Sequence, residues 1–176
     1  MNIGGILLAL QGAASQGILW GVLVLGVYIT YKILDIADLT VDGSFALGGC
    51  VCATLVVSHG MNPVLALVLA TLAGMIAGAV TGLLHTAFDI PAILAGILTQ
   101  IALWSINLRI MGKSNIPLLK TETIFSGFVE ATGLKSSQAS GLIGLIIAVV
   151  IIIALYWFFG TEIGSALRAT GNNEDM

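Results

Sequence analysis

The sequence predicts an all-α membrane protein, a polytopic helical bundle of about five spans, and two observations support this fold class. First, 58% of the 176 residues are hydrophobic and only 9% are charged, with a mean hydropathy of +1.09, whereas a soluble domain carries about 25% charged residues. Second, the charges are clustered. A membrane-spanning helix needs about 20 apolar residues, and four long stretches carry no charge: 1–31, 43–88, 90–108 and 136–161.

Glycine, proline and polar residues divide these stretches into segments of membrane length. The first stretch is expected to break at 11–17, which leaves a short N-terminal apolar segment at 2–11. A turn at 59–63 and another at 88–91 separate the next helices, and all three prolines fall in predicted connections. The predicted spans are 14–33, 44–59, 64–86, 92–111 and 141–160.

An acidic segment precedes the second span. Asp35, Asp38 and Asp42 are spaced three and four residues apart, so a continuous helix would place them on one face. Gly43 and its hydroxyl-bearing neighbours are poor helix formers, and a buried carboxylate at mid-membrane costs at least about 2.5 kcal/mol. We favour a broken helix near 35–44 that faces a protein-lined path. A plain interfacial loop and a cation-binding cluster are the alternatives.

Small and polar residues inside the spans predict how the helices pack. Gly74, Gly78 and Gly82 share one helical face, which fits packing within the chain or against another subunit. Cys50 and Cys52 are two residues apart on a helix, face different directions and are expected to be packing residues.

Polar side chains such as Gln100 in the fourth span either join helices by hydrogen bonds or line a solute path. The candidate pathway residues are Asp38, Thr40, Asp42, Ser44, Thr99 and Asn107. The sequence contains no catalytic or metal-binding motif, so we expect no enzymatic activity, cofactor or metal ion. A net charge of −3 offers no basic surface for nucleic acid.

Four segments resemble one family of membrane proteins. Residues 38–49, DLTVDGSFALGG, and 89–99, DIPAILAGILT, are similar to segments of bacterial ABC transporter permeases of the branched-chain amino acid and ribose type. Residues 105–117 resemble the amino-acid-like branch of that family, and Asp42 replaces a glycine of the sugar branch. Residues 164–174, GSALRATGNNE, are similar to the cytoplasmic loop that docks into the ATPase, which is the most specific of these motifs.

The resemblance implies a permease subunit of a binding-protein-dependent importer for a small polar, amino-acid-like solute. Its implied partners are an ATP-binding cassette ATPase that hydrolyses the ATP, an external solute-binding protein and a second permease subunit. The implied location is the bacterial plasma (inner) membrane. Residues 1–160 would form the transmembrane domain and 161–176 the coupling loop, with a short helix that Ser165 caps. The implied coupling residues are Gly164, Ala166, Leu167, Arg168, Ala169, Gly171, Asn172, Asn173 and Glu174.

Family members continue with further spans, so the chain is expected to be truncated after the coupling loop. The lysines of the 112–140 segment would place it in the cytoplasm by charge. The resemblance instead places 161–176 there, and 112–140 outside. Two alternatives remain: a self-contained solute-binding membrane subunit, and a CDP-alcohol phosphotransferase-like enzyme, whose D-G-x-x-A-R motif is not matched after Asp42.

Overall fold

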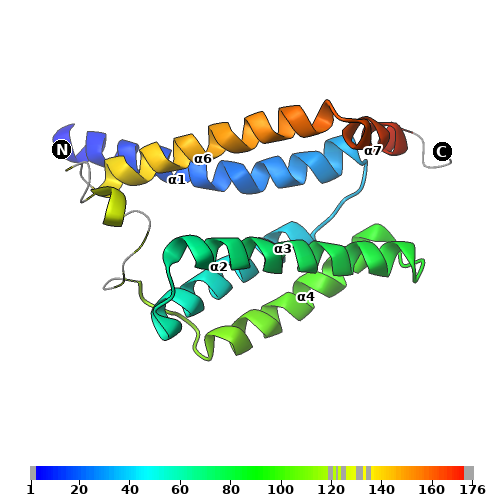
Figure 1. Cartoon of the computed structure of the whole chain (residues 1–176), viewed down its shortest axis with the longest axis horizontal. Coiled ribbons are helices and arrows are strands. Elements are labelled where there is room, and N and C mark those ends of the chain that lie inside the picture. Colours follow the sequence, from blue (N-terminus) through cyan, green and yellow to red (C-terminus); the bar gives the residue numbers. More distant parts are fainter. Residues whose placement is uncertain are drawn as a thin grey trace. The chain divides into compact units, whose positions relative to one another are not determined.

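A computed structural model describes residues 3–118, 121, 123, 126–129, 133 and 136–172 of the chain. The chain divides into two compact units. The first contains residues 1–35 and 124–176, and the second contains residues 36–123. The regular elements of the described residues are all helices, and five are long and apolar enough to span a membrane (Figure 1). The prediction of an all-α polytopic protein is confirmed. The five candidate spans are Ala9–Ile33, Thr40–His59, Pro63–Thr86, Ala92–Met111 and Gln138–Phe159.

The first unit begins with α1 (Ile3–Tyr28), which continues as a π-helical turn, η1 (Ile29–Ile33). The break expected at 11–17 is therefore wrong, because the helix runs through it. Within this stretch the Ser15 hydroxyl donates to the Gln11 carbonyl oxygen at 2.9 Å, a hydrogen bond inside the helix. Ser15 is also buried, with 8% of its surface exposed, so this polar stretch is part of a packed helix face.

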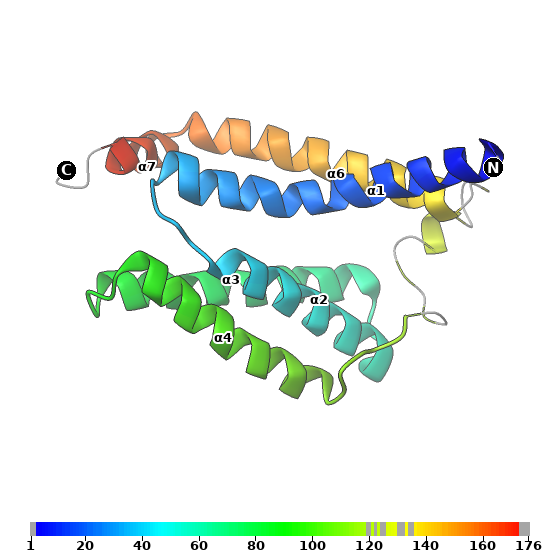
Figure 2. The ribbon, with the colours of Figure 1, turned by 180° about the vertical axis from the view of Figure 1, so that it is seen from behind.

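Helix α6 (Ser136–Phe159) packs beside α1, and the two helices run in the same direction (Figures 1 and 2). Glycines on α6 permit the close approach. A Cβ atom on Gly141 would lie 3.4 Å from the Ser15 Cβ, and one on Gly144 would lie 3.3 Å from a methyl carbon of Leu19. Small residues commonly form helix interfaces in membranes, where lipid offers little hydrophobic drive for association. Helix α7 (Glu162–Asn172) follows α6 after a short turn.

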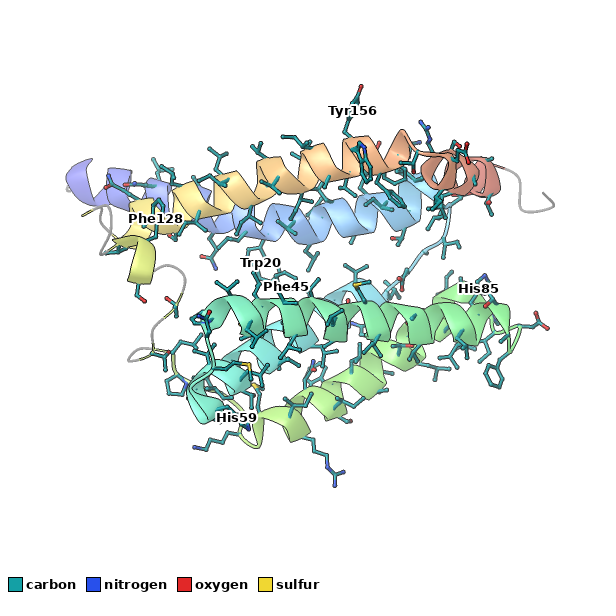
Figure 3. The ribbon with its side chains drawn as sticks, in the orientation of Figure 1. Trp20, Phe45, His59, His85, Phe128 and Tyr156 are labelled. Atoms are coloured by element: carbon teal, nitrogen blue, oxygen red, sulfur yellow. The ribbon has the colours of Figure 1, made fainter. Side chains whose placement is uncertain are left out.

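Large apolar side chains cover the outer surface of α6. Tyr156 projects outward from the helix (Figure 3) and is 85% exposed, and Trp157 and Ile153 are 72% and 62% exposed. In water such a surface would be unfavourable, whereas acyl chains solvate it well. The arrangement agrees with a helix that faces lipid.

The broken helix predicted before the second span is present, displaced toward the N-terminus. Helical structure stops after η1 and resumes at Thr40, with Asp35 in the left-handed region at φ 55°. The Asp38 carboxylate accepts a hydrogen bond from the Thr40 amide at 2.8 Å and so satisfies one amide at the start of the next helix. Asp42 and Ser44, expected within the break, lie instead in the first turns of that helix.

The second unit contains α2 (Thr40–His59), α3 (Pro63–Thr86) and α4 (Ala92–Met111). Its core contains Leu47, Ala77 and Leu103, one from each helix. The predicted turn at 59–63 is confirmed: Gly60 adopts φ 58°, and the Asn62 side chain accepts from the Val64 amide at 2.9 Å. These short connections make α3 antiparallel to both neighbours, so α2 and α4 run in the same direction.

The buried face of α3 is formed by alanines and a threonine rather than by the predicted glycines. A Cβ atom on Gly74 would lie 4.0 Å from the Ser44 carbonyl oxygen, an ordinary contact, but one on Gly78 or Gly82 would meet no atom within 4 Å. Within the described residues, packing at the glycine face is thus limited to Gly74, and a subunit interface there stays a prediction. The buried residues of α3 are Ala66, Ala70, Ala77 and Thr81.

Candidate functional site

Helices α2 and α4 approach closely because each places a glycine at the contact. A Cβ atom on Gly43 would lie 3.3 Å from the Gln100 Cα and 3.1 Å from a methyl carbon of Leu103. A Cβ atom on Gly96 would lie only 2.9 Å from the backbone nitrogen of Leu39. Side chains of the two helices that flank these contacts are therefore held side by side.

The break before α2 lies at the depth of the neighbouring helices rather than beyond their ends. Leu39 contacts Gly96, which is about one turn inside α4, and the Thr40 hydroxyl is 2.9 Å from that of Thr81, more than a turn before α3 ends. At about 1.5 Å per residue, the break is about 6–8 Å inside the two helix ends. The Thr81 hydroxyl is also 3.3 Å from the Ala77 carbonyl oxygen, and either hydroxyl can be the donor in the threonine pair.

A cleft of about 370 Å³ runs along α2 and α4, with a mostly apolar lining that includes several polar side chains. At its Asp42 end, the Gln100 side-chain amide donates to the Asp42 carboxylate at 3.3 Å. Farther along α4 the cleft is lined by Asn107, which is 7% exposed and whose side-chain oxygen is buried without a hydrogen-bond partner in the described chain. Such an unpaired buried carbonyl costs about 1–3 kcal/mol. The cleft therefore combines a carboxylate with an amide whose buried oxygen has no partner in the described chain.

Of the six predicted pathway residues, the structure brings Asp42 and Asn107 to this cleft. The others have partners elsewhere: Asp38 and Thr40 make the contacts described above, the Ser44 hydroxyl donates to the Val41 carbonyl oxygen at 3.1 Å, and the buried Thr99 hydroxyl donates within α4 at 3.0 Å. A pathway role for all six residues stays a prediction.

The sequence pattern indicates Gln100 only as a polar residue of a span and does not mark Trp104 or Ser114 as site residues. Gln100, Trp104 and Asn107 follow one another at helical spacing and line one cleft. That periodicity was present in the sequence, but only the contact with α2 shows which face of α4 meets Asp42.

The three aspartates before and within α2 serve separate purposes in the structure. Asp35 occupies a left-handed turn, Asp38 accepts from a backbone amide, and Asp42 lines the cleft. Among the described residues, no three histidine, cysteine, aspartate or glutamate side chains are grouped as metal ligands would be. The acidic segment is better explained by helix initiation and by the cleft than by a cation site.

The loop after α6 forms a helix, α7, with a different cap from the one predicted. The Thr161 hydroxyl accepts from the Gly164 amide at 3.3 Å, so Thr161 takes the capping role expected of Ser165. The Ser165 hydroxyl instead donates backward to the Glu162 carbonyl oxygen at 2.8 Å. The helix starts earlier because a threonine hydroxyl stands directly before Glu162. It continues through Gly171, whereas Asn173 and Glu174 lie outside the described residues.

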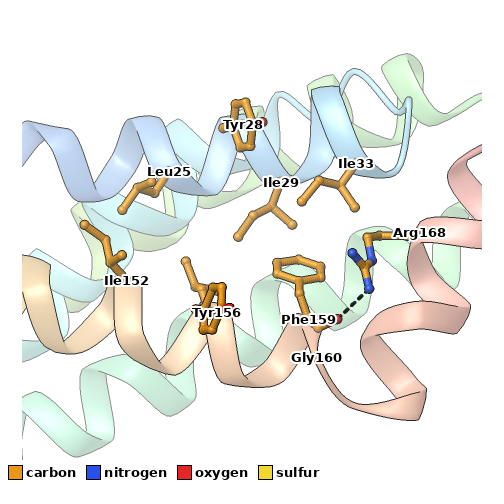
Figure 4. A pocket seen from close by; sticks show the side chains of 10 residues that line it. Leu25, Tyr28, Ile29, Ile33, Ile152, Tyr156, Phe159, Gly160 and Arg168 are labelled. Carbon is orange, nitrogen blue, oxygen red and sulfur yellow. Dashed lines mark hydrogen bonds between the residues drawn. The ribbon is translucent and has the colours of Figure 1, made fainter.

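Two glycines of α7 allow it to pack directly against the backbone of α6 and of η1. A Cβ atom on Gly164 would overlap the Phe158 carbonyl oxygen, and one on Gly171 would overlap the carbonyl oxygen of Ile33 in η1. The Arg168 guanidinium donates to the Phe159 carbonyl oxygen at 2.8 Å, at the edge of an apolar pocket of about 480 Å³ between α1 and α6 (Figure 4). One face of α7 thus contacts the ends of two spans, while Ala166 and Ala169 stay exposed.

Comparison with known proteins gives consistent results. The sequence model of a family described as "Branched-chain amino acid transport system / permease component" matches residues 9–176. A tyrosine transport system permease protein of Clostridioides difficile (strain R20291) is 40% identical over 162 residues, 92% of this chain and 52% of that protein. An uncharacterized protein of Rickettsia prowazekii (strain Madrid E) is 36% identical over 166 residues, covering 93% of this chain and 55% of its own length. No solved structure matches the chain significantly.

Proposed function

Because the chain belongs to the permease family of branched-chain amino acid transport systems, we propose that it acts as the permease of an ABC importer for an amino-acid-like solute. The family is one of transport proteins rather than enzymes. The chain spans about half the length of the curated relatives it matches, 52% and 55% of them. The activity proposed here is that of the complete transporter in which the chain takes part.

The cleft between α2 and α4 is the observation that carries this proposal. A carboxylate on Asp42 and a buried amide on Asn107 are expensive beside lipid, and they are tolerated where they face a solute path. Its lining runs from Asp42 to Cys50 on α2 and from Gln100 to Met111 on α4, so the cleft follows about half of each of two helices of membrane length. A small polar solute could move along it while the surrounding side chains stay apolar.

Helix α7 is proposed as the element that receives motion from the ATPase. Its contacts support this role, because Gly164 rests on the end of α6 and Gly171 rests on η1. A rigid helix seated on the ends of two spans transmits a displacement to both of them. The exposed face, with Ala166 and Ala169, is then available to the ATPase, which we place with residues 161–176 in the cytoplasm.

The proposed assembly contains two permease subunits, two ATPases and an external solute-binding protein in a bacterial inner membrane. It is tested by reconstituting the permease with an ABC ATPase and a solute-binding protein from the same organism. We expect ATP hydrolysis stimulated by the loaded binding protein, together with uptake of labelled L-tyrosine or L-leucine. Absence of both activities with each of these solutes would contradict an amino acid importer.

The coupling role of α7 has its own test in the same preparation. Replacing Arg168 by Ala and Gly171 by Val removes the contact with Phe159 and obstructs the contact with Ile33. We expect assembly with the ATPase to weaken or stimulated hydrolysis to fall, while basal hydrolysis by the free ATPase is unchanged. Stimulated hydrolysis equal to that of the unmodified transporter would refute the coupling assignment.

A further inference from the structure

We propose that the cleft between α2 and α4 is a binding site for the ammonium group of the solute, with Asp42 as its counter-charge. This inference rests on the proposed transport function and adds which end of the solute the chain recognises. Among the described residues, the lining of the cleft includes one carboxylate and no lysine, arginine or histidine. A carboxylate group of a solute would find no cation there.

The Asp42 carboxylate is available to a ligand. It accepts one hydrogen bond, from Gln100 to one of its two oxygens, and within the described residues it forms no ion pair. An ionised carboxylate has room for about four hydrogen bonds, so most of its capacity is unused. The Asp42 side chain is exposed along the cleft, so a primary ammonium group, with three donors and a compensating charge, can reach its free oxygen.

Two further side chains of the cleft, Asn107 and Trp104, can also bind an ammonium group. Asn107 has an amide oxygen without a partner although the residue is only 7% exposed, and rotation of that amide can offer the oxygen to a donor in the cleft. Trp104 lines the cleft between Gln100 and Asn107 along α4, and aromatic rings bind cations through their faces. The cleft thus offers acceptors and an aromatic surface along its length, which a transported ammonium group can contact in succession.

Cys50 provides a direct reporter because it also lines the cleft, while Cys52 does not, and both are free thiols. The purified chain in lipid nanodiscs is labelled with two methanethiosulfonates, one bearing trimethylammonium and the other sulfonate. Cys52→Ser leaves only Cys50 to react, and Cys50→Ser leaves only Cys52 as the matched reference. The ratio of the cationic to the anionic rate cancels differences in the reactivity of each thiol.

We expect this ratio to be about tenfold or more higher at Cys50 than at Cys52, since a cleft of one charge sign concentrates counter-ions by about 10-fold to 1,000-fold. Asp42→Asn should bring the two ratios to within about twofold. Asp89→Asn removes an equal charge from the connection before α4, outside the cleft, and should change nothing. Equal ratios at the two cysteines, or a preference that survives Asp42→Asn, would overturn the proposal.

Protection of Cys50 then identifies the group that binds. Tyramine has the ammonium group of tyrosine without its carboxylate, and 3-(4-hydroxyphenyl)propionate has the carboxylate without the ammonium. Tyramine and L-tyrosine should slow the labelling of Cys50, whereas the deaminated acid should not. Equal protection by the acid, or by potassium chloride at the same concentration as tyramine, would refute an ammonium site. Because labelling needs no ATPase, a failed uptake assay with an intact charge preference would contradict only the transport function.

Discussion

Replacement of Gly96 by Ala tests the contact that holds the helix break against α4. The added Cβ atom would lie 2.9 Å from the backbone nitrogen of Leu39 and 3.4 Å from a carboxylate oxygen of Asp38. The nearer atom belongs to backbone that the Asp38–Thr40 hydrogen bond restrains, so it cannot move aside as a flexible side chain would. Overpacking of this kind typically costs about 1–3 kcal/mol.

The same substitution also replaces a glycine inside a helix by alanine. That replacement by itself stabilises a helix by roughly 0.5–1 kcal/mol. Gly78→Ala is therefore the matched control, because it brings the same gain on α3 while its Cβ atom would meet no atom within 4 Å. We expect the free energy of unfolding of Gly96→Ala to fall below that of Gly78→Ala by about 1–3 kcal/mol.

The assay is reversible unfolding of the purified chain in mixed micelles, followed by the loss of helical circular dichroism as the fraction of denaturing detergent rises. Cys50 labelling of the same variants reports on the cleft beside the contact. Equal stabilities for Gly96→Ala and Gly78→Ala would refute the reasoning, because the backbone contact at Leu39 would then carry no free energy.

Three further substitutions have definite expected outcomes. Thr40→Val should lower the free energy of unfolding by about 0.5–1.5 kcal/mol, and a double-mutant cycle with Thr81→Val should give a coupling energy of that size; additive effects would argue against the buried hydroxyl pair. Asn107→Leu should raise the stability of the chain in micelles by up to about 1–3 kcal/mol, because it removes a buried unpaired oxygen, and should reduce solute uptake; a destabilised variant would contradict this account. Gly171→Val should speed amide hydrogen exchange throughout α7, whereas Ala169→Val on the exposed face should not; equal exchange rates would mean that α7 does not rest on η1.

Several features followed from local sequence because they depend on local physics. Helix length and apolarity are properties of a segment, so the spans ending at His59, Thr86 and Met111 were predicted to within a few residues. The break before α2 was also predictable, since an acidic segment cannot continue through lipid as a helix. Its position was not, because the Asp38 carboxylate satisfies the Thr40 amide and lets α2 begin earlier.

Other features depended on contacts between segments distant in the sequence. The stretch at 11–17 has the composition of a turn, yet Ser15 is buried beside Gly141 and the helix continues. The glycine face of α3 had the spacing of a packing interface, but Ala70 and Ala77 are the buried residues. Spacing identifies which residues share a face, and only the neighbouring helix decides which face is covered.

The sequence by itself determined that the chain is a multi-pass helical membrane protein of a permease family. The length of an apolar segment and a short motif are both properties of consecutive residues, so they can be recognised without the tertiary structure. The tertiary structure decided which polar groups meet. Asp42 and Gln100 are joined only because Gly43 and Gly96 bring α2 and α4 together, and Asn107 is left with an unpaired oxygen in the same cleft. The physical reason is that the cost of a polar group in a membrane depends on what lies opposite it, and the opposite residue comes from another helix.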